Sequence, residues 1–211
     1  MKITSFRTWV TVISITILSS TCFNIAYANM PSKINNMKQT LDSYTLSTPH
    51  WYVEGNFGIS HLFDKQATGT VASVDENGPG ASLIAGYQFN SMLGTELGYT
   101  QYYNSRETSN RTIVAKTQHL AVDLAATGRL PLINKLSALG KLGVAYSYAQ
   151  KMFITTGVAG SSGAVSVYGG LGLDYSLTPT TDFIAQWARA KGNDYTGSSD
   201  LYSIGLNFAL V

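Results

Sequence analysis

Three histidines, His50, His61 and His119, are the residues of this chain best suited to acid–base chemistry or metal binding. Ser60 and Asp64 lie close to His61, so a hydroxyl, an imidazole and a carboxylate, the groups of a serine hydrolase, occur together. A strand would place Ser60 and His61 on opposite faces, and no nucleophile-elbow motif surrounds the serine. Because the histidines are also scattered, we assign no catalytic residue, metal ligand or cofactor, and predict that the chain is not an enzyme.

A second polar set recurs at alternate positions within otherwise apolar segments. Its members are Glu54, Glu96, His119, Asp123, Lys141 and Asp174. If the segments are strands, these side chains share the face opposite the apolar ones. We predict that they form a polar network inside a closed sheet, where charges must pair or be hydrated. Acids outnumber bases in the set, so we expect water, His119 or a protonated carboxyl group to complete the network. An ion or proton path is the alternative interpretation.

The N-terminus has the order of a secretory signal peptide. A short basic region precedes the apolar stretch Trp9–Phe23, and Ala26-Tyr27-Ala28 forms a small-residue cleavage site. The apolar stretch is shorter than the roughly 20 residues of a membrane-spanning helix. We therefore predict a signal peptide over residues 1–28. A flexible periplasmic segment is expected over the polar residues 29–50.

The composition excludes several functional classes once the signal is removed. The only cysteine, Cys22, lies in the signal, so the mature chain has neither disulfides nor a cysteine-based zinc site. The 14 lysines and arginines include Lys2 and Arg7, which leaves as many bases as the 12 acids. A neutral chain of this kind gives no indication of nucleic-acid binding.

From Trp51 onward the sequence alternates apolar and polar residues in segments of a length that suits tilted membrane strands, which need about 9–11 residues. We predict eight strands: Trp51–Phe63, Gly80–Asn90, Leu93–Tyr103, Lys116–Gly128, Leu136–Ala149, Ala164–Leu177, Thr181–Lys191 and Asp200–Leu210. Residues 51–211 are therefore predicted to form an all-β domain, an eight-stranded antiparallel up-and-down transmembrane β-barrel.

The connections between these segments alternate in length. Short ones are predicted at Ser91-Met92, Arg129–Lys135 and Thr178–Thr180. Long ones are predicted at Asp64–Pro79, Asn104–Ala115, Gln150–Gly163 and Gly192–Ser199. Outer-membrane barrels have short periplasmic turns and longer external loops, so we expect the long connections to lie outside the cell.

The apolar face has the properties of a lipid-facing surface. Large aromatic residues, such as Trp51 and Phe208 at one end and Tyr148 and Tyr202 at the other, fall near both ends of the segments. Two aromatic belts are typical of a protein that crosses two membrane interfaces. Arg189 falls on the same face near the loop end, where we expect its side chain to reach the lipid headgroups.

Two stretches resemble a known family. Val167–Trp187 (VYGGLGLDYSLTPTTDFIAQW) is similar to the Gly-rich strand, "LTP" turn and following strand of the OmpA-type and opacity-type outer-membrane β-barrel superfamily. The C-terminus resembles the assembly signal of such barrels, through Ser203, Gly205, Phe208 and Leu210, although the usual final aromatic residue is absent. The resemblance implies location in the bacterial cell outer membrane and recognition by the barrel-assembly machinery.

The function that we expect is that of a non-enzymatic barrel with a side-chain-filled interior. Such a protein supports envelope integrity and presents surface loops for adhesion or host contact. Its expected partners are outer-membrane lipid and lipopolysaccharide, the barrel-assembly machinery and a host surface ligand, with no nucleic acid. Two alternatives stay open: a membrane-embedded enzyme that modifies lipid A or phospholipid, and a narrow channel.

Overall fold

The computed structural model describes residues 48–63, 73–109, 112–153, 157, 159–192 and 196–210. The predicted signal peptide and most of the predicted segment 29–50 lie outside these residues. His50, which was assigned to the flexible segment, is instead the first residue of a strand. No helix long and apolar enough to cross a bilayer occurs in the described ranges.

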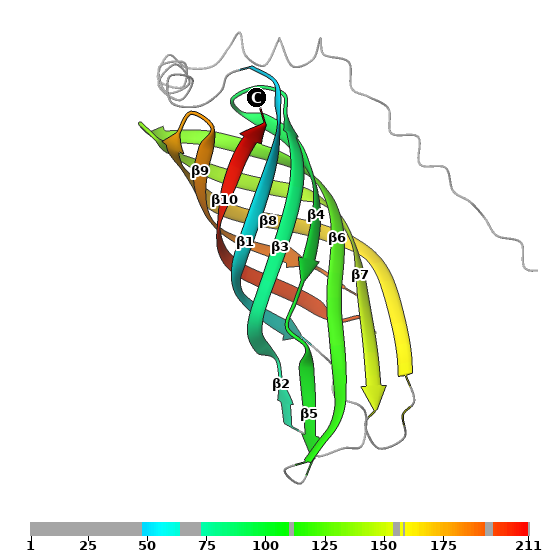
Figure 1. The fold of residues 1–211 in the computed structure, drawn as a ribbon. Helices are drawn as coiled ribbons and strands as arrows, with labels where there is room; N and C mark the ends of the chain where they lie inside the picture. The colour runs from blue at the N-terminus through cyan, green and yellow to red at the C-terminus, as the bar shows by residue number, and fades with distance from the viewer. Residues whose placement is uncertain are drawn as a thin grey trace, which may run out of the picture. The chain divides into compact units, whose positions relative to one another are not determined.

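Ten strands are present in the described part of the chain. They are β1 (His50–Phe63), β2 (Ser73–Asp75), β3 (Asn77–Gln88), β4 (Leu93–Gln101), β5 (Ser105–Ser109), β6 (Thr112–Ile133), β7 (Leu136–Phe153), β8 (Ala159–Thr178), β9 (Thr181–Ala190) and β10 (Ser198–Leu210). Eight of them form a closed ring in the order β6-β4-β3-β1-β10-β9-β8-β7, and the pairing of β6 with β7 closes it (Figure 1). Every pairing is antiparallel, so the predicted eight-stranded barrel is confirmed.

The alternation of side chains along each strand gives the barrel wall an apolar outer face and a largely polar inner face. In β1, Trp51, Phe57 and Ile59 are more than half exposed, whereas Glu54 and Ser60 are buried. Comparable rows of exposed leucine, valine, phenylalanine and tyrosine side chains occur on the other barrel strands. Soluble monomers rarely expose so large a continuous apolar surface, whereas a barrel in lipid requires one.

Tight turns join the strands at one end of the barrel. Asn134 and Lys135 alone form the turn between β6 and β7, and Asn134 has a φ of 37°, a conformation that asparagine tolerates. The predicted loop Arg129–Lys135 is therefore too long, because β6 continues to Ile133. Pro131 is accommodated in this strand beside a register shift, as expected for a proline near a bulge.

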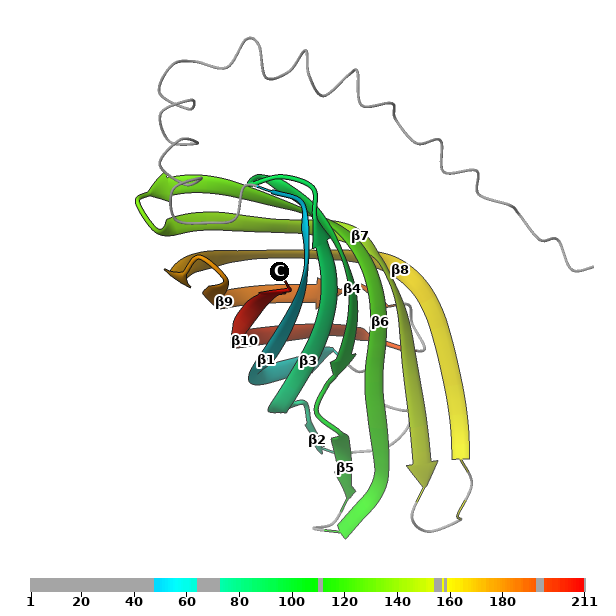
Figure 2. The same cartoon turned by 45° about the horizontal axis from the view of Figure 1, so that its top comes forward.

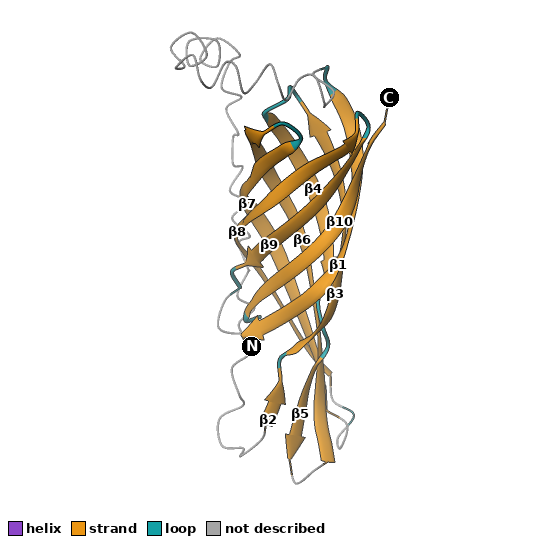
Figure 3. Ribbon diagram, turned by 90° about the vertical axis from the view of Figure 1, so that its left-hand side faces the viewer, coloured by secondary structure: helices purple, strands orange, loops and turns teal. Residues whose placement is uncertain are grey.

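At the opposite end, strands extend into segments that were predicted to be loops. The predicted loop Asn104–Ala115 contains β5 and the start of β6, and Gln150–Gly163 contains the end of β7 and the start of β8. Likewise β2 and the start of β3 lie in the predicted loop Asp64–Pro79. Pairing of β2 with β5 and of β5 with β6 continues the sheet beyond the ends of β1 and β4 (Figures 1 and 3).

Candidate functional site

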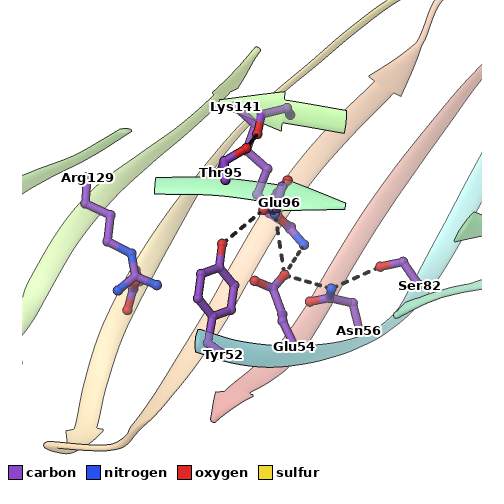
Figure 4. A network of polar contacts seen from close by, with 11 residues as sticks. Tyr52, Glu54, Asn56, Ser82, Thr95, Glu96, Arg129 and Lys141 are labelled. Carbon is purple, nitrogen blue, oxygen red and sulfur yellow. Dashed lines mark hydrogen bonds and ion pairs between the residues drawn. The ribbon is translucent and has the colours of Figure 1, made fainter. Parts of the chain in front are cut away.

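The centre of the barrel interior contains an ion cluster built around one lysine. The Nζ atom of Lys141 lies 3.0 Å from Oε2 of Glu96 and 3.5 Å from Oε1 of Glu54 (Figure 4). Their side chains come from β7, β4 and β1, no two of which are hydrogen-bonded to each other. The cluster therefore connects three strands that are not neighbours in the barrel wall, through contacts across the interior.

Neutral polar side chains add hydrogen bonds to one oxygen of each carboxylate, whereas Oε1 of Glu96 has no hydrogen-bond partner among the described residues. Oε1 of Glu54 accepts hydrogen bonds from Nδ2 of Asn56 at 2.8 Å and from Nε2 of Gln186 at 2.9 Å. The Tyr52 hydroxyl donates to Oε2 of Glu96 at 3.5 Å. Both glutamates are about 1% exposed, so these donors stabilise charges that are shielded from solvent.

A second ion cluster lies nearer the tight turns. Nε of Arg129 lies 3.0 Å from Oδ2 of Asp174, and its Nη1 lies 3.5 Å from Oδ2 of Asp182. Asp174 was predicted to face the interior, but its partner Arg129 was not, because the arginine was placed in a turn. Asp123, Thr127 and Arg129 lie an even number of positions apart, so a strand that continued through Arg129 would have placed all three side chains on the inward face. This spacing is the signal that could have identified Arg129.

The other two predicted interior residues do not join these clusters. Asp123 is 2% exposed, and no hydrogen bond from the described residues reaches its Oδ2 atom. His119 lies towards the loop end, with its Nε2 atom 3.4 Å from the Ser105 hydroxyl. The six predicted residues are therefore all buried inside the barrel but form separate groups rather than one network.

An apolar layer surrounds the level of Asp123. Its members are Leu62, Tyr102, Ala121, Ala125, Ala145, Tyr168, Ala188, Ala190 and Leu201. On β6 this layer separates His119 from Arg129, since Ala121 and Ala125 lie between them on the inward face. Side chains fill the interior here, as in other narrow eight-stranded barrels.

Two of the residues that suggested hydrolase chemistry, Ser60 and His61, lie on opposite faces of the barrel wall, and the third, Asp64, lies outside the described residues. Ser60 points inward, where its hydroxyl donates to the Gly78 carbonyl at 3.2 Å and accepts from the Tyr103 amide at 2.9 Å. His61 lies on the outward face and contacts the Asn77 side chain. No cluster of three or more potential metal ligands occurs among the described side chains. The backbone contacts of Ser60 indicate a structural role.

Arg189 is paired with a carboxylate on the neighbouring strand, and its contact with the lipid headgroups stays a prediction. Its Nε and Nη2 atoms lie 2.5 and 2.6 Å from the two carboxylate oxygens of Asp200, on the neighbouring strand β10. The guanidinium also faces the rings of Phe63 and Trp187 at 5.0 and 5.6 Å from their centroids. The pair lies on the outward face, because Arg189 alternates with the inward residues Ala188 and Ala190.

Residues 47–211 match the family model of the OmpA-like transmembrane domain. The chain belongs to this family. No match was found among curated proteins. The family resemblance expected from the sequence is thereby confirmed, and location in the bacterial outer membrane follows from it.

Solved structures of other outer-membrane proteins share the fold of this OmpA-like domain. Ail, the attachment invasion locus protein of Yersinia pestis, is 17% identical with a TM-score of 0.53, over 77% of this chain and 99% of Ail. Neisserial surface protein A is 17% identical with a TM-score of 0.55, over 76% and 97%. OprG from Pseudomonas aeruginosa is 17% identical with a TM-score of 0.50, over 79% and 98%. At these identities the comparison establishes the fold alone.

The predicted assembly signal of this OmpA-like domain forms the last strand. Ser203 is buried on the inward face of β10, whereas Phe208 and Leu210 are about half exposed on the lipid face. A Cβ atom on Gly205 would lie 2.1 Å from Oδ1 of Asn56, so only glycine fits against β1 at this position. These placements give the residues structural roles, and their recognition during assembly stays a prediction.

Proposed function

We propose that this protein is a non-enzymatic outer-membrane barrel that supports envelope integrity and presents a sheet extension at the cell surface for adhesion or host contact. Paired charges and apolar side chains fill the interior, which favours a scaffold over a channel. The separation of Ser60 from His61 across the barrel wall favours a scaffold over a hydrolase. In barrels of this type the end with tight turns faces the periplasm, so the extended strands face outside.

The observation that carries the adhesion proposal is an open strand edge in this extension. β8 pairs with β7 from Met152↔Ala159 onward, but its pairing with β9 begins only at Tyr168. Within the described residues, no strand pairs with the other side of β8 between residues 159 and 166. Figure 2 shows this part of β8 as the outermost strand of the extension.

The direction of the unpaired backbone groups follows from one hydrogen bond. The Lys191 amide donates to the Val167 carbonyl at 3.0 Å, so residue 167 directs its backbone polar groups towards β9. Alternate residues of an antiparallel strand point to the same side, and therefore residues 165, 163 and 161 face the open edge. Exposed edges commonly carry lysine or proline, which hinder pairing with another strand. Residues 159–166 (AGSSGAVS) contain neither, so an extended polypeptide segment can add as a further strand.

A proline at the edge tests this role. Ser161→Pro removes a backbone donor from the open side of β8, at an edge position where proline is tolerated. Ser161→Thr is the matched control, because it changes the side chain but keeps the donor. A non-adherent bacterial strain that expresses each variant at equal surface level is assayed for attachment to cultured epithelial cells. We expect bacteria that express the native chain or Ser161→Thr to attach more than bacteria with the empty vector. Bacteria that express Ser161→Pro should attach only at the empty-vector level.

Two outcomes of this assay contradict the proposal. Attachment of the native chain at the empty-vector level argues against an adhesive role for the barrel. Full attachment of Ser161→Pro argues against the β8 edge as the contact surface.

The enzymatic alternative has its own test. Purified, refolded protein is expected to release no fatty acid from lipid A or phospholipid. Turnover that disappears on His61→Ala or His119→Ala, with the barrel still folded, would replace the scaffold interpretation with an enzymatic one.

A further inference from the structure

The outward face of β1, β9 and β10 has a layered chemistry along the strand direction. The register places His61 opposite Asp200 and Asp200 opposite Arg189, which forms a polar row across the three strands. The next outward row contains Ile59 opposite Tyr202 and Tyr202 opposite Trp187, and the row after it contains apolar side chains only. On β9 and β10 these rows are polar, aromatic and apolar in turn, which is the order of a membrane interface from headgroup to acyl chain.

The polar row holds one guanidinium in a fixed orientation. Asp200 is only 2% exposed and accepts from Nε and Nη2 of Arg189, while the Arg189 side chain remains 42% exposed. The rings of Phe63 and Trp187 limit its movement further. The Nη1 group takes no part in the pair with Asp200, so it can donate to an anion while the carboxylate beneath stays covered.

The apolar row contains a groove. Ala185 is a small residue among Phe57, Tyr202 and Ile204, and the groove that these side chains line has a volume of about 470 Å³. Ala185 precedes Arg189 by four positions on β9, which corresponds to roughly 13 Å at the rise of a β-strand. A phosphate at Arg189 and an acyl chain at Ala185 are therefore within the reach of one lipid molecule.

We propose that this face binds one molecule of lipid A, with a phosphate at Arg189 and an acyl chain in the groove at Ala185. The site lies at the end of the barrel that carries the extended strands, which places it in the outer leaflet, where lipid A is the anchor of lipopolysaccharide. A phosphorylated sugar matches the polar row because it combines negative charge with hydroxyl groups. The proposal is independent of the adhesive role of the β8 edge.

Lipid binding to the folded, purified protein tests the site. Native mass spectrometry in detergent follows titration with lipid A and, separately, with dipalmitoyl phosphatidylglycerol. The double variant Arg189→Gln/Asp200→Asn removes the cation without leaving its carboxylate unpaired, and Ala185→Leu fills the groove. Lys116→Gln is the control, since it removes an exposed cation from β6, outside the site. A heat-dependent shift on gel electrophoresis confirms that each variant is folded.

We expect one lipid A molecule per barrel, bound about tenfold more weakly by Arg189→Gln/Asp200→Asn, as for loss of one charge-assisted hydrogen bond. Ala185→Leu should also weaken binding, and Lys116→Gln should not. Equal binding by the native chain and the double variant contradicts the headgroup contact. Equal affinity for phosphatidylglycerol contradicts the assignment to lipid A. If the double variant fails to fold, Ala185→Leu decides alone, and unchanged binding by it overturns the proposal.

Discussion

Lys141→Met removes the only cation of the central cluster and should strongly destabilise the barrel. The lysine lies 3.0 Å from one glutamate oxygen and 3.5 Å from the other. At an effective dielectric constant of about 20, each attraction amounts to roughly 5 kcal/mol before the cost of desolvation is subtracted. Methionine preserves the apolar length of the side chain but leaves Glu54 and Glu96 as two buried carboxylates without a cation. We expect a loss of about 3–5 kcal/mol, the usual cost of breaking a buried ion pair.

The assay is equilibrium unfolding by guanidinium chloride in detergent micelles or lipid vesicles, followed by tryptophan fluorescence. A triple variant, Lys141→Met/Glu54→Gln/Glu96→Gln, removes all three charges together. Its stability should return most of the way to that of the native protein, because no buried charge remains unpaired. Glu107→Gln serves as a control, since its partner Lys151 lies in the extension beyond the barrel centre. A loss below about 1 kcal/mol for Lys141→Met, or no recovery in the triple variant, would refute the reasoning.

Two further predictions concern the faces and the orientation of the barrel. Leu124→Arg places a charge on the lipid face near the middle of β6 and should lower the free energy of unfolding by roughly 2–4 kcal/mol, whereas Asp123→Asn, on the inward face, should change it little. Guanidinium unfolding in vesicles measures the stability of both variants. A larger loss for Asp123→Asn than for Leu124→Arg would mean that the faces are misassigned. A peptide tag inserted at Gly157 should be labelled by antibody on intact cells, and a tag at Asn134 only after permeabilisation; labelling of the Asn134 tag on intact cells would invert the topology.

The strand faces were predictable because lipid and a filled interior impose opposite requirements on neighbouring residues. Glu54 and Phe57 in β1 illustrate this, since one is buried among polar partners and the other is exposed to lipid. The extents of the loops were harder to predict. The strand β5 (SRETS) contains no apolar residue, so no alternation of apolar and polar side chains distinguishes it from a loop.

The pairing of interior charges could not be derived from the sequence. Lys141 contacts Glu54 and Glu96 across the interior, and these contacts depend on the stagger of eight strands relative to one another. Arg129 was missed for a different reason, because Pro131 just beyond it is typical of a turn. Tyr102 and Tyr168 are also buried inside the barrel, and no pattern in the sequence singled them out as part of the interior.

Refolding of the mature chain with and without an amphiphile tests the central claim most directly. Denatured protein is diluted into plain buffer or into detergent, and each sample is run on gel electrophoresis with and without heating. A transmembrane barrel should acquire β-structure and a heat-dependent shift in mobility only in detergent or lipid. Efficient refolding to a monodisperse monomer in plain buffer would contradict a lipid-facing surface and, with it, the outer-membrane barrel.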